Sequence, residues 1–192
     1  MTRLLVFPLL ALSACQAKPA EQNAAAADQP AWPGPGEALP TGKLDRSHAG
    51  SAAPDTEFAG VDGQPSSIGD FAGRPVLLNL WATWCGPCVA EMPTLDALAG
   101  REGEALTVLP VSQDTAGRER VAAWFDKQGF KNLELRRDPE MKLMADLKVD
   151  TLPTTILYDG EGHEVWRVTG MEDWDSGRTA LLLKEASPAA AR

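Results

Sequence analysis

Two short runs of apolar residues, at 76–82 and 106–111, predict buried strands. The first run contains a single polar residue, Asn79. Continuous apolar runs of this length are typical of strands in a sheet that is covered on both faces. Pro110 cannot donate a hydrogen bond to a neighbouring strand, so we expect a bulge or a strand end there. Residues 133–135 are a weaker candidate for a short strand.

Segments with apolar residues at helical spacing alternate with these strands. Asp114 or Thr115 is expected to cap the second of them, and Gly129 to end it. A proline in the first turn, Pro139, is expected to open the third. The expected helices span residues 89–98, 114–129, 139–147 and 173–186.

Turn residues predict two hairpins. Asp159-Gly160-Glu161-Gly162 separates strands at 154–158 and 164–168, and a shorter hairpin joins residues 58–59 to 66–68. Strands that alternate with helices and end in an antiparallel hairpin indicate an α/β fold, with a mixed central sheet and helices on both faces.

The start of the chain has a different pattern. An apolar run at 4–12 follows Arg3 and leads through small residues to Cys15. As a helix, this run would rise only about 14 Å, roughly half a bilayer core, so we expect a signal peptide at 1–14 rather than a spanning segment. Leu12-Ser13-Ala14-Cys15 resembles the lipobox of bacterial lipoproteins, which implies that Cys15 is a lipid anchor. The alternative is an ordinary cleaved signal peptide that leaves Cys15 as a free thiol.

Residues 16–52 are rich in alanine and proline and lack periodic apolar positions. Such a segment cannot bury enough surface to offset the entropy of ordering, so we expect a flexible tether. The expected organisation is therefore a lipidated cysteine and tether at 15–52, a globular domain at 53–187, and a disordered tail at 188–192.

Composition and charge exclude one class of partner. The 27 acidic residues outnumber the 18 basic ones, and the net charge is −9. Nucleic-acid affinity depends on clustered Lys and Arg side chains, which this sequence lacks, so we expect no nucleic-acid partner.

We also expect no metal site, because the two histidines, His48 and His163, have no partner at metal-ligand spacing and the one C-x-x-C motif lacks a second pair.

That motif, Cys85-Gly86-Pro87-Cys88, lies between the strand at 76–82 and the helix that follows. A cysteine at a helix N-terminus faces unpaired N–H groups and the positive end of the helix dipole, both of which favour the thiolate. We expect Cys85 to be the exposed nucleophile. Cys88, one turn further in, is placed to attack the mixed disulfide that Cys85 forms.

The residues around this pair resemble the thioredoxin family. Trp84-Cys85-Gly86-Pro87-Cys88 matches the thioredoxin motif, and Pro93 matches a helix-kinking proline of that family. Leu152-Pro153-Thr154 matches the segment whose proline is cis and packs beside the disulfide. The resemblance implies a thioredoxin-like fold, a redox-active Cys85–Cys88 disulfide with no other cofactor, and substrate contacts at Trp84, Gly86, Pro87, Leu152 and Pro153.

Within that superfamily the chain looks most like the membrane-anchored TlpA/ResA-like thiol-disulfide oxidoreductases. Residues 76–93 carry the likeness, and so does an extra helix-strand-helix insertion between 111 and 153. Thioredoxin has a buried aspartate six residues before its first cysteine, where this chain has Asn79, and an amide cannot act as a general base. Glu91 matches an active-site glutamate of the ResA-like group and is the candidate proton relay; an ordinary solvated glutamate is the alternative.

These observations predict a periplasmic, lipid-anchored enzyme that reduces disulfides in envelope proteins. Family resemblance suggests apocytochrome c or copper-site assembly proteins as substrates and a membrane electron donor of the DsbD or CcdA type. Two alternatives stay open: a copper(I) chaperone that uses both thiolates as soft ligands, and a disulfide oxidant or isomerase.

Overall fold

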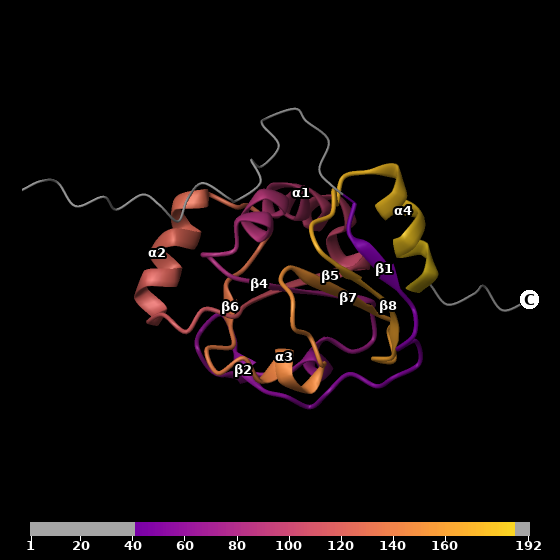
Figure 1. Cartoon of the computed structure of the whole chain (residues 1–192), viewed down its shortest axis with the longest axis horizontal. Helices are drawn as coiled ribbons and strands as arrows, with labels where there is room; N and C mark the ends of the chain where they lie inside the picture. The colour runs from indigo at the N-terminus through magenta and orange to yellow at the C-terminus, as the bar shows by residue number, and fades with distance from the viewer. Residues whose placement is uncertain (1–40, 187–192) are drawn as a thin grey trace, which may run out of the picture. The chain divides into compact units, whose positions relative to one another are not determined.

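The computed structural model describes residues 41–186 (Figure 1), and within this range eight strands form one sheet in the order β1-β8-β7-β4-β5-β6-β2-β3. The strands are β1 (Lys43–Asp45), β2 (Phe58–Ala59), β3 (Pro65–Ser66), β4 (Val76–Trp81), β5 (Thr107–Ser112), β6 (Arg136–Arg137), β7 (Thr154–Tyr158) and β8 (Glu164–Thr169). The α-helices are α1 (Gly86–Glu102), α2 (Arg118–Gln128), α3 (Lys142–Asp146) and α4 (Gly177–Leu183). Short 3₁₀ helices lie at Ile68–Phe71, Gly103–Ala105 and Lys184–Ala186.

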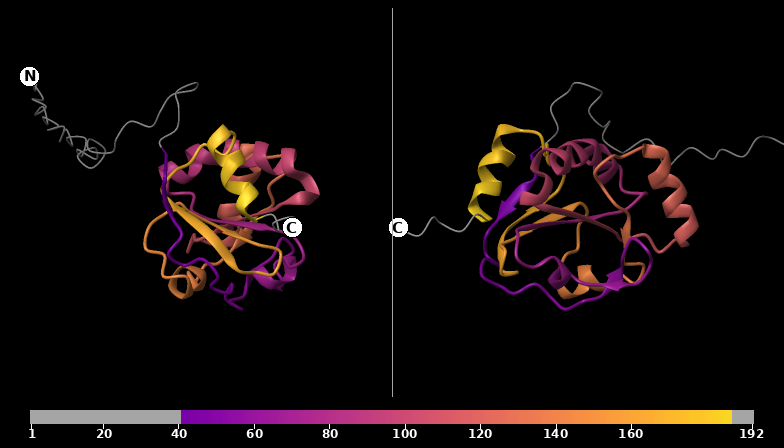
Figure 2. Two further views of the ribbon diagram at one scale, coloured as in Figure 1. Left: turned by 90° about the vertical axis from the view of Figure 1, so that its right-hand side faces the viewer. Right: turned by 180° about the vertical axis from the view of Figure 1, so that it is seen from behind.

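The sheet is mixed, as predicted. Strand β4 pairs in parallel with β5 and antiparallel with β7, and β7 and β8 form the expected terminal hairpin. Strands β2 and β3 form the smaller hairpin. Helices α1 and α4 lie over one face of the sheet and α3 over the other (Figures 1 and 2). The predicted insertion is α2-β6-α3, which lies between β5 and β7.

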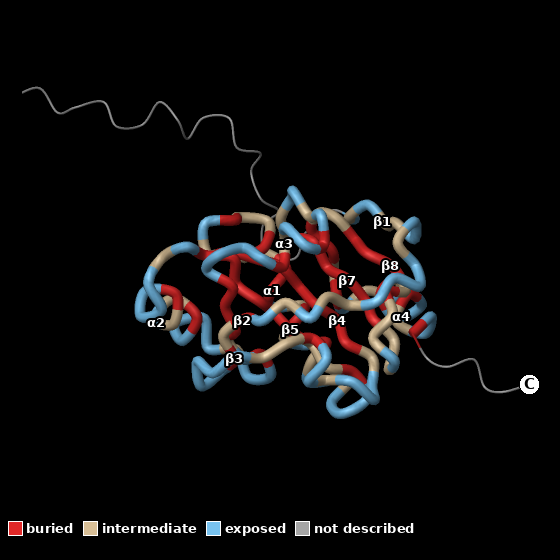
Figure 3. The backbone as a smooth tube through the Cα atoms, turned by 90° about the horizontal axis from the view of Figure 1, so that it is seen from below, coloured by how far each residue is buried: buried red, intermediate tan, exposed pale blue. Residues whose placement is uncertain are grey.

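Alternation along β4 divides the core into two layers. Successive side chains of a strand point to opposite faces. Leu77 and Trp81 belong to the cluster that contains the α1 side chains, whereas Leu78 and Leu80 belong to the cluster that contains α3. Asn79 therefore shares the α1 face with Leu77 and Trp81. Figure 3 shows that the buried backbone runs through these central strands.

The ordered domain begins earlier than the predicted boundary at residue 53. Strand β1 pairs antiparallel with β8, with Leu44 opposite Val168, and Ala52 bridges to His163. Backbone hydrogen bonds to an existing strand edge hold this segment, and such pairing needs no apolar periodicity. The expected tether is thus wrong for residues 43–52, while the signal peptide, Cys15 and the tail at 188–192 lie outside the described residues.

Four of the expected elements start later than predicted. Helix α2 begins at Arg118 because Asp114 accepts hydrogen bonds from Thr83 and Ser112 instead of capping a helix. Helix α3 begins after Met141, beyond Pro139. Strand β6 lies at Arg136–Arg137 rather than at 133–135, and α4 starts after Ser176, whose hydroxyl accepts from the Thr179 N–H.

Pro110 lies inside β5, and the register with β4 continues through it without a bulge. The predicted interruption was wrong because β6 pairs only with Val111 and Ser112. At Pro110 one side of β5 therefore has no neighbouring strand, and a missing amide hydrogen is tolerated there. No helix between residues 41 and 186 has both the length and the apolar character needed to cross a membrane.

Candidate active site

The two cysteines of the C-x-x-C motif form a disulfide at the N-terminus of α1. Strand β4 ends at Trp81, and a short loop leads to Cys85, which is the N-cap residue of α1. The Cys88 N–H donates to the Cys85 sulfur at 3.3 Å, and the two Cα atoms are 5.3 Å apart. At the N-cap position the Cys85 sulfur accepts one of the N–H groups of the first helical turn and lies at the positive end of the helix dipole, which is the arrangement that stabilises a thiolate.

Cys85 is more accessible than Cys88, as predicted, but it is itself buried rather than exposed. Cys88 is completely buried, Cys85 keeps 5% of its surface, and the neighbouring Trp84 is 68% exposed. Gly86 and Pro87 form the first turn of α1 and are half-buried, and Pro93 lies further along the same helix. Of the two sulfur-bearing residues, Cys85 is the one that a partner can approach, beside the exposed indole ring.

The loop that precedes β7 brings Pro153 to the same end of the sheet. The Leu152–Pro153 peptide bond is cis, as the resemblance implied. Thr154 pairs with Leu80, so Pro153 falls at the end of β4 from which the Cys85 loop emerges. Leu152 is half-buried and Pro153 is buried. The predicted substrate-contact residues thus gather around one end of β4.

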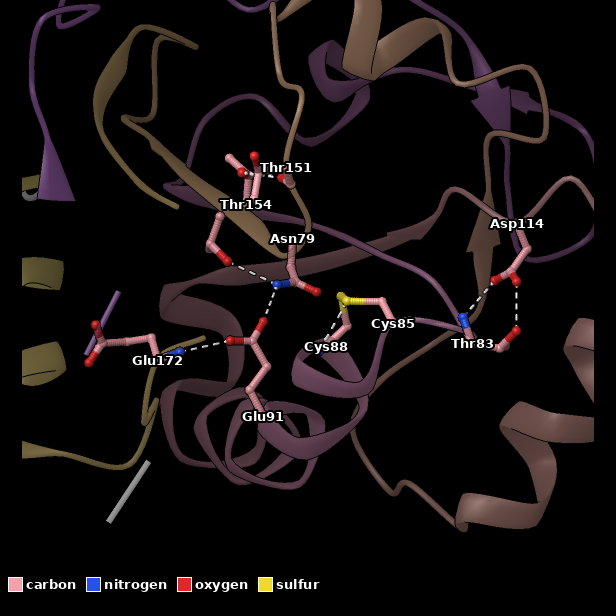
Figure 4. The surroundings of a disulfide bond; sticks show 10 residues. Asn79, Thr83, Cys85, Cys88, Glu91, Asp114, Thr151, Thr154 and Glu172 are labelled. Carbon is pink, nitrogen blue, oxygen red and sulfur yellow. Dashed lines mark hydrogen bonds between the residues drawn. A yellow bond between two sulfur atoms is a disulfide. The ribbon is translucent and has the colours of Figure 1, made fainter. Parts of the chain in front are cut away.

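Glu91 is buried one turn after Cys88, beneath the disulfide (Figure 4). Its Oε1 accepts from Asn79 Nδ2 at 2.8 Å, and its Oε2 accepts from the backbone N–H of Glu172 at 2.9 Å. Burial raises the pKa of Glu91 to about 8, although both hydrogen bonds and the nearby Trp174 indole oppose that rise. Glu91 is therefore not the solvated helix glutamate that was the alternative.

Asn79 connects Glu91 to the sheet. Its side-chain amide nitrogen donates both to Glu91 and to the Thr155 hydroxyl on β7, at 2.9 Å. From the sequence, Asn79 could be compared with the buried aspartate of thioredoxin, but no role of its own could be assigned to it. The available signal was that a polar residue inside an apolar strand needs buried partners.

A second feature missed from the sequence fixes the loop before Cys85. Asp114, which is 1% exposed, accepts from the Thr83 N–H at 2.9 Å and from the Thr83 hydroxyl at 2.6 Å. The Ser112 hydroxyl donates to the same carboxylate at 2.7 Å. These bonds tie the loop between β4 and α1 to the end of β5.

We expect Asp114→Ala to lower the free energy of unfolding by about 2–4 kcal/mol, because three hydrogen-bond donors lose a charged acceptor. Urea unfolding of the oxidised protein measures this loss. The control is Asp126→Ala on the exposed surface of α2, which should change stability by less than about 0.5 kcal/mol. Equal stabilities of the Asp114 and Asp126 variants would contradict the role of Asp114.

In the described part of the chain, no group of three or more His, Cys, Asp or Glu side chains is arranged to hold a metal ion. The chemistry that the site offers with its own groups is that of two adjacent sulfur atoms and a buried carboxyl group. These groups support dithiol-disulfide exchange.

Comparison with known proteins identifies the same chemistry. Residues 49–166 match the AhpC/TSA family. The chain is 35% identical over 115 residues to the thioredoxin-like protein YneN of Bacillus subtilis, covering 59% of this chain and 66% of that protein. It is 30% identical over 124 residues to the thiol-disulfide oxidoreductase ResA of Geobacillus kaustophilus, covering 63% and 69%. The chain thus spans about two thirds of the length of these two relatives.

A solved structure gives the same fold. The pneumococcal exposed lipoprotein thioredoxin of Streptococcus pneumoniae is 31% identical, with a TM-score of 0.59, and the match covers 67% of this chain and 98% of that one. The thioredoxin-like α/β fold that the sequence predicted is thereby confirmed. The chain belongs to the AhpC/TSA family and, within the thioredoxin superfamily, to the TlpA/ResA-like thiol-disulfide oxidoreductases.

Proposed function

We propose that this protein is a reductase of protein disulfides that acts through Cys85 and Cys88. The observation that carries the proposal is the graded burial at the N-terminus of α1, where Cys85 caps the helix beside the exposed Trp84 and Cys88 is fully buried behind it. A helix N-cap favours a thiolate, and an exposed aromatic side chain next to it gives a flat apolar surface for a substrate chain.

In the proposed reaction the Cys85 thiolate attacks a substrate disulfide, forms a mixed disulfide and releases the first substrate sulfur as a thiolate. The Cys88 thiol then loses its proton and attacks the Cys85 sulfur. The second substrate sulfur leaves as a thiolate, and the Cys85–Cys88 disulfide forms. The substrate has gained two electrons, and its two thiolates take up protons.

Glu91 is the proposed proton carrier for Cys88. It lies on the same helix, three residues later, and residues at this spacing are neighbours on the helix surface. A pKa of about 8 lies close to the ambient pH, so the carboxyl group can accept the Cys88 proton and later return it. Leu152 and Pro153 are proposed to hold the substrate chain beside the cysteines.

We further propose that the protein works outside the cytoplasm and is anchored by a lipid on Cys15. The lipobox-like segment Leu12–Cys15 supports the anchor, as does the likeness to a pneumococcal protein that is named an exposed lipoprotein thioredoxin. The family resemblance extends the proposal to apocytochrome c or copper-site assembly proteins as substrates. A membrane protein of the DsbD or CcdA type would reduce the Cys85–Cys88 disulfide back to the dithiol, since the envelope is oxidising.

Trapping of free thiols in intact cells tests the proposed direction of electron flow. We expect Cys85 and Cys88 to be reduced in cells that contain a DsbD- or CcdA-type donor and to be a disulfide when the donor gene is deleted. A pair that is oxidised in both strains would contradict the reductase proposal. Purification with stoichiometric copper and without disulfide reduction would contradict it as well, in favour of a copper-binding protein.

A further inference from the structure

A buried acceptor without a partner lies in the site. Among the described residues, the Asn79 carbonyl oxygen, Oδ1, is buried and accepts no hydrogen bond. The side chain itself is fully buried. A buried polar atom without a partner costs free energy, and native proteins contain few of them. A few other buried polar atoms of the described residues also lack a partner, and the Asn79 Oδ1 atom is distinguished from them by its place beside the redox-active disulfide.

The surroundings of Asn79 fix where this oxygen points. Its amide nitrogen is held on one side by Glu91 and Thr155, which accept its two hydrogens. Glu91 is in turn held by the Glu172 backbone N–H. The Oδ1 atom must then face the other way, and Figure 4 shows it pointing toward the Cys85–Cys88 disulfide.

A disulfide has no hydrogen to donate, whereas a thiol has one. We propose that Asn79 is a positioning residue that stabilises the reduced form of the enzyme, because its Oδ1 accepts a hydrogen bond from the Cys88 thiol that exists only after the disulfide is cleaved. Cys88 is the donor because it is completely buried and lies one helical turn from Glu91, the residue to which Asn79 is bonded.

The redox step that creates this bond is balanced by a dithiol donor. The donor loses two electrons and two protons and becomes a disulfide, while the S–S bond between Cys85 and Cys88 breaks. One hydrogen ends on each cysteine sulfur. The Cys88 thiol then donates its hydrogen to the Asn79 Oδ1 atom, which has no donor in the oxidised form. The inference holds for electron flow in either direction and does not depend on the proposed substrates.

The test is the redox equilibrium of Asn79→Leu with glutathione. Leucine has a similar shape but offers no acceptor, so we expect the equilibrium to shift toward the Cys85–Cys88 disulfide by about three- to tenfold, the effect of one hydrogen bond. Tenfold corresponds to about 30 mV for this two-electron couple. The measurement uses the full chain at pH 6, below the pKa of Glu91, and the cysteine peptides are followed by mass after alkylation.

Thr155→Val is the matched control. It removes the hydroxyl that accepts from Asn79 Nδ2 but leaves Oδ1 in place. We expect this variant to lose stability in both redox states and to keep the glutathione equilibrium within about twofold of the wild type. A purely structural role of Asn79 would make the two variants alike. Equal equilibria for wild type and Asn79→Leu, or an equal shift in both variants, would overturn the proposal.

A second measurement applies even if Asn79→Leu does not fold. The infrared S–H stretching band of Cys88 can be isolated in the Cys85→Ser protein. The spectrum to subtract is that of the protein in which Cys85 and Cys88 are both replaced by serine. We expect the band at the lower frequency of a hydrogen-bonded thiol. A band at the frequency of a free thiol would contradict the bond to Asn79.

Discussion

Replacing Cys85 by serine is expected to lower the rate of protein-disulfide reduction by about a thousandfold or more, because the hydroxyl group cannot replace the thiolate as nucleophile. The Cys88→Ser protein should also turn over poorly, but for another reason. Its Cys85 still attacks the substrate, and the mixed disulfide then accumulates because the sulfur that resolves it is missing. Reduction of a soluble disulfide-containing protein, followed by non-reducing electrophoresis, distinguishes the two outcomes.

The control for this pair is Cys15→Ser. The proposed role of Cys15, which is not among the residues that the structure describes, is attachment to the membrane, so its replacement should leave the rate with a soluble substrate unchanged. A mixed disulfide that accumulates in Cys85→Ser rather than in Cys88→Ser would reverse the assigned roles of the two sulfurs.

The second large effect concerns stability and pH. The pKa of Glu91 is raised from an ordinary 4.5 to about 8, mainly by burial, so the folded protein holds a proton that the unfolded chain has released. Where the folded state binds more protons, stability falls as pH rises. The contribution of Glu91 is fully present below pH 4.5 and is lost as pH rises to about 8. Between pH 5.5 and 8.5 we expect the ionisation of Glu91 alone to lower the free energy of unfolding of the oxidised protein by about 3 kcal/mol.

Urea unfolding at these two pH values, for wild type and for Glu91→Gln, measures this loss. The glutamine variant cannot ionise, so the wild type should lose about 3 kcal/mol more than the variant over the interval. Glu104→Gln, at an exposed position, serves as a control that should follow the wild type. Parallel pH profiles for wild type and Glu91→Gln would show that Glu91 ionises in the folded protein as it does in the unfolded chain.

The fold could be predicted from the sequence where apolar patterning decides it. The buried strand β4, the hairpin of β7 and β8, and the C-x-x-C at the start of α1 follow from local residues, and all three lie where predicted. Strand β1 could not be found in this way because its stability comes from pairing with β8, more than 120 residues later in the chain. The start of α2 was misplaced because Asp114 serves as an acceptor for a distant loop.

The site could be predicted only in part, because some of its contacts join elements that are far apart in the sequence. Two cysteines and a glutamate on one helix can be placed from spacing alone, and the structure brings all three together. Asn79 could be compared only with a family pattern, because its role depends on partners contributed by two other elements. Glu91 comes from α1 and Thr155 from β7. An interaction that needs three elements at once is visible only in the folded chain.

The most direct test of the account is the pH dependence of alkylation of the reduced protein, with each cysteine followed separately by mass. We expect Cys85 to react first and to reach half of its maximal rate at a lower pH than glutathione in a parallel reaction, because the N-terminus of α1 stabilises its thiolate. Cys88 should stay protected by burial. If Cys88 reacts first, or if Cys85 titrates like glutathione, the helix does not activate Cys85 and the proposed exchange is contradicted.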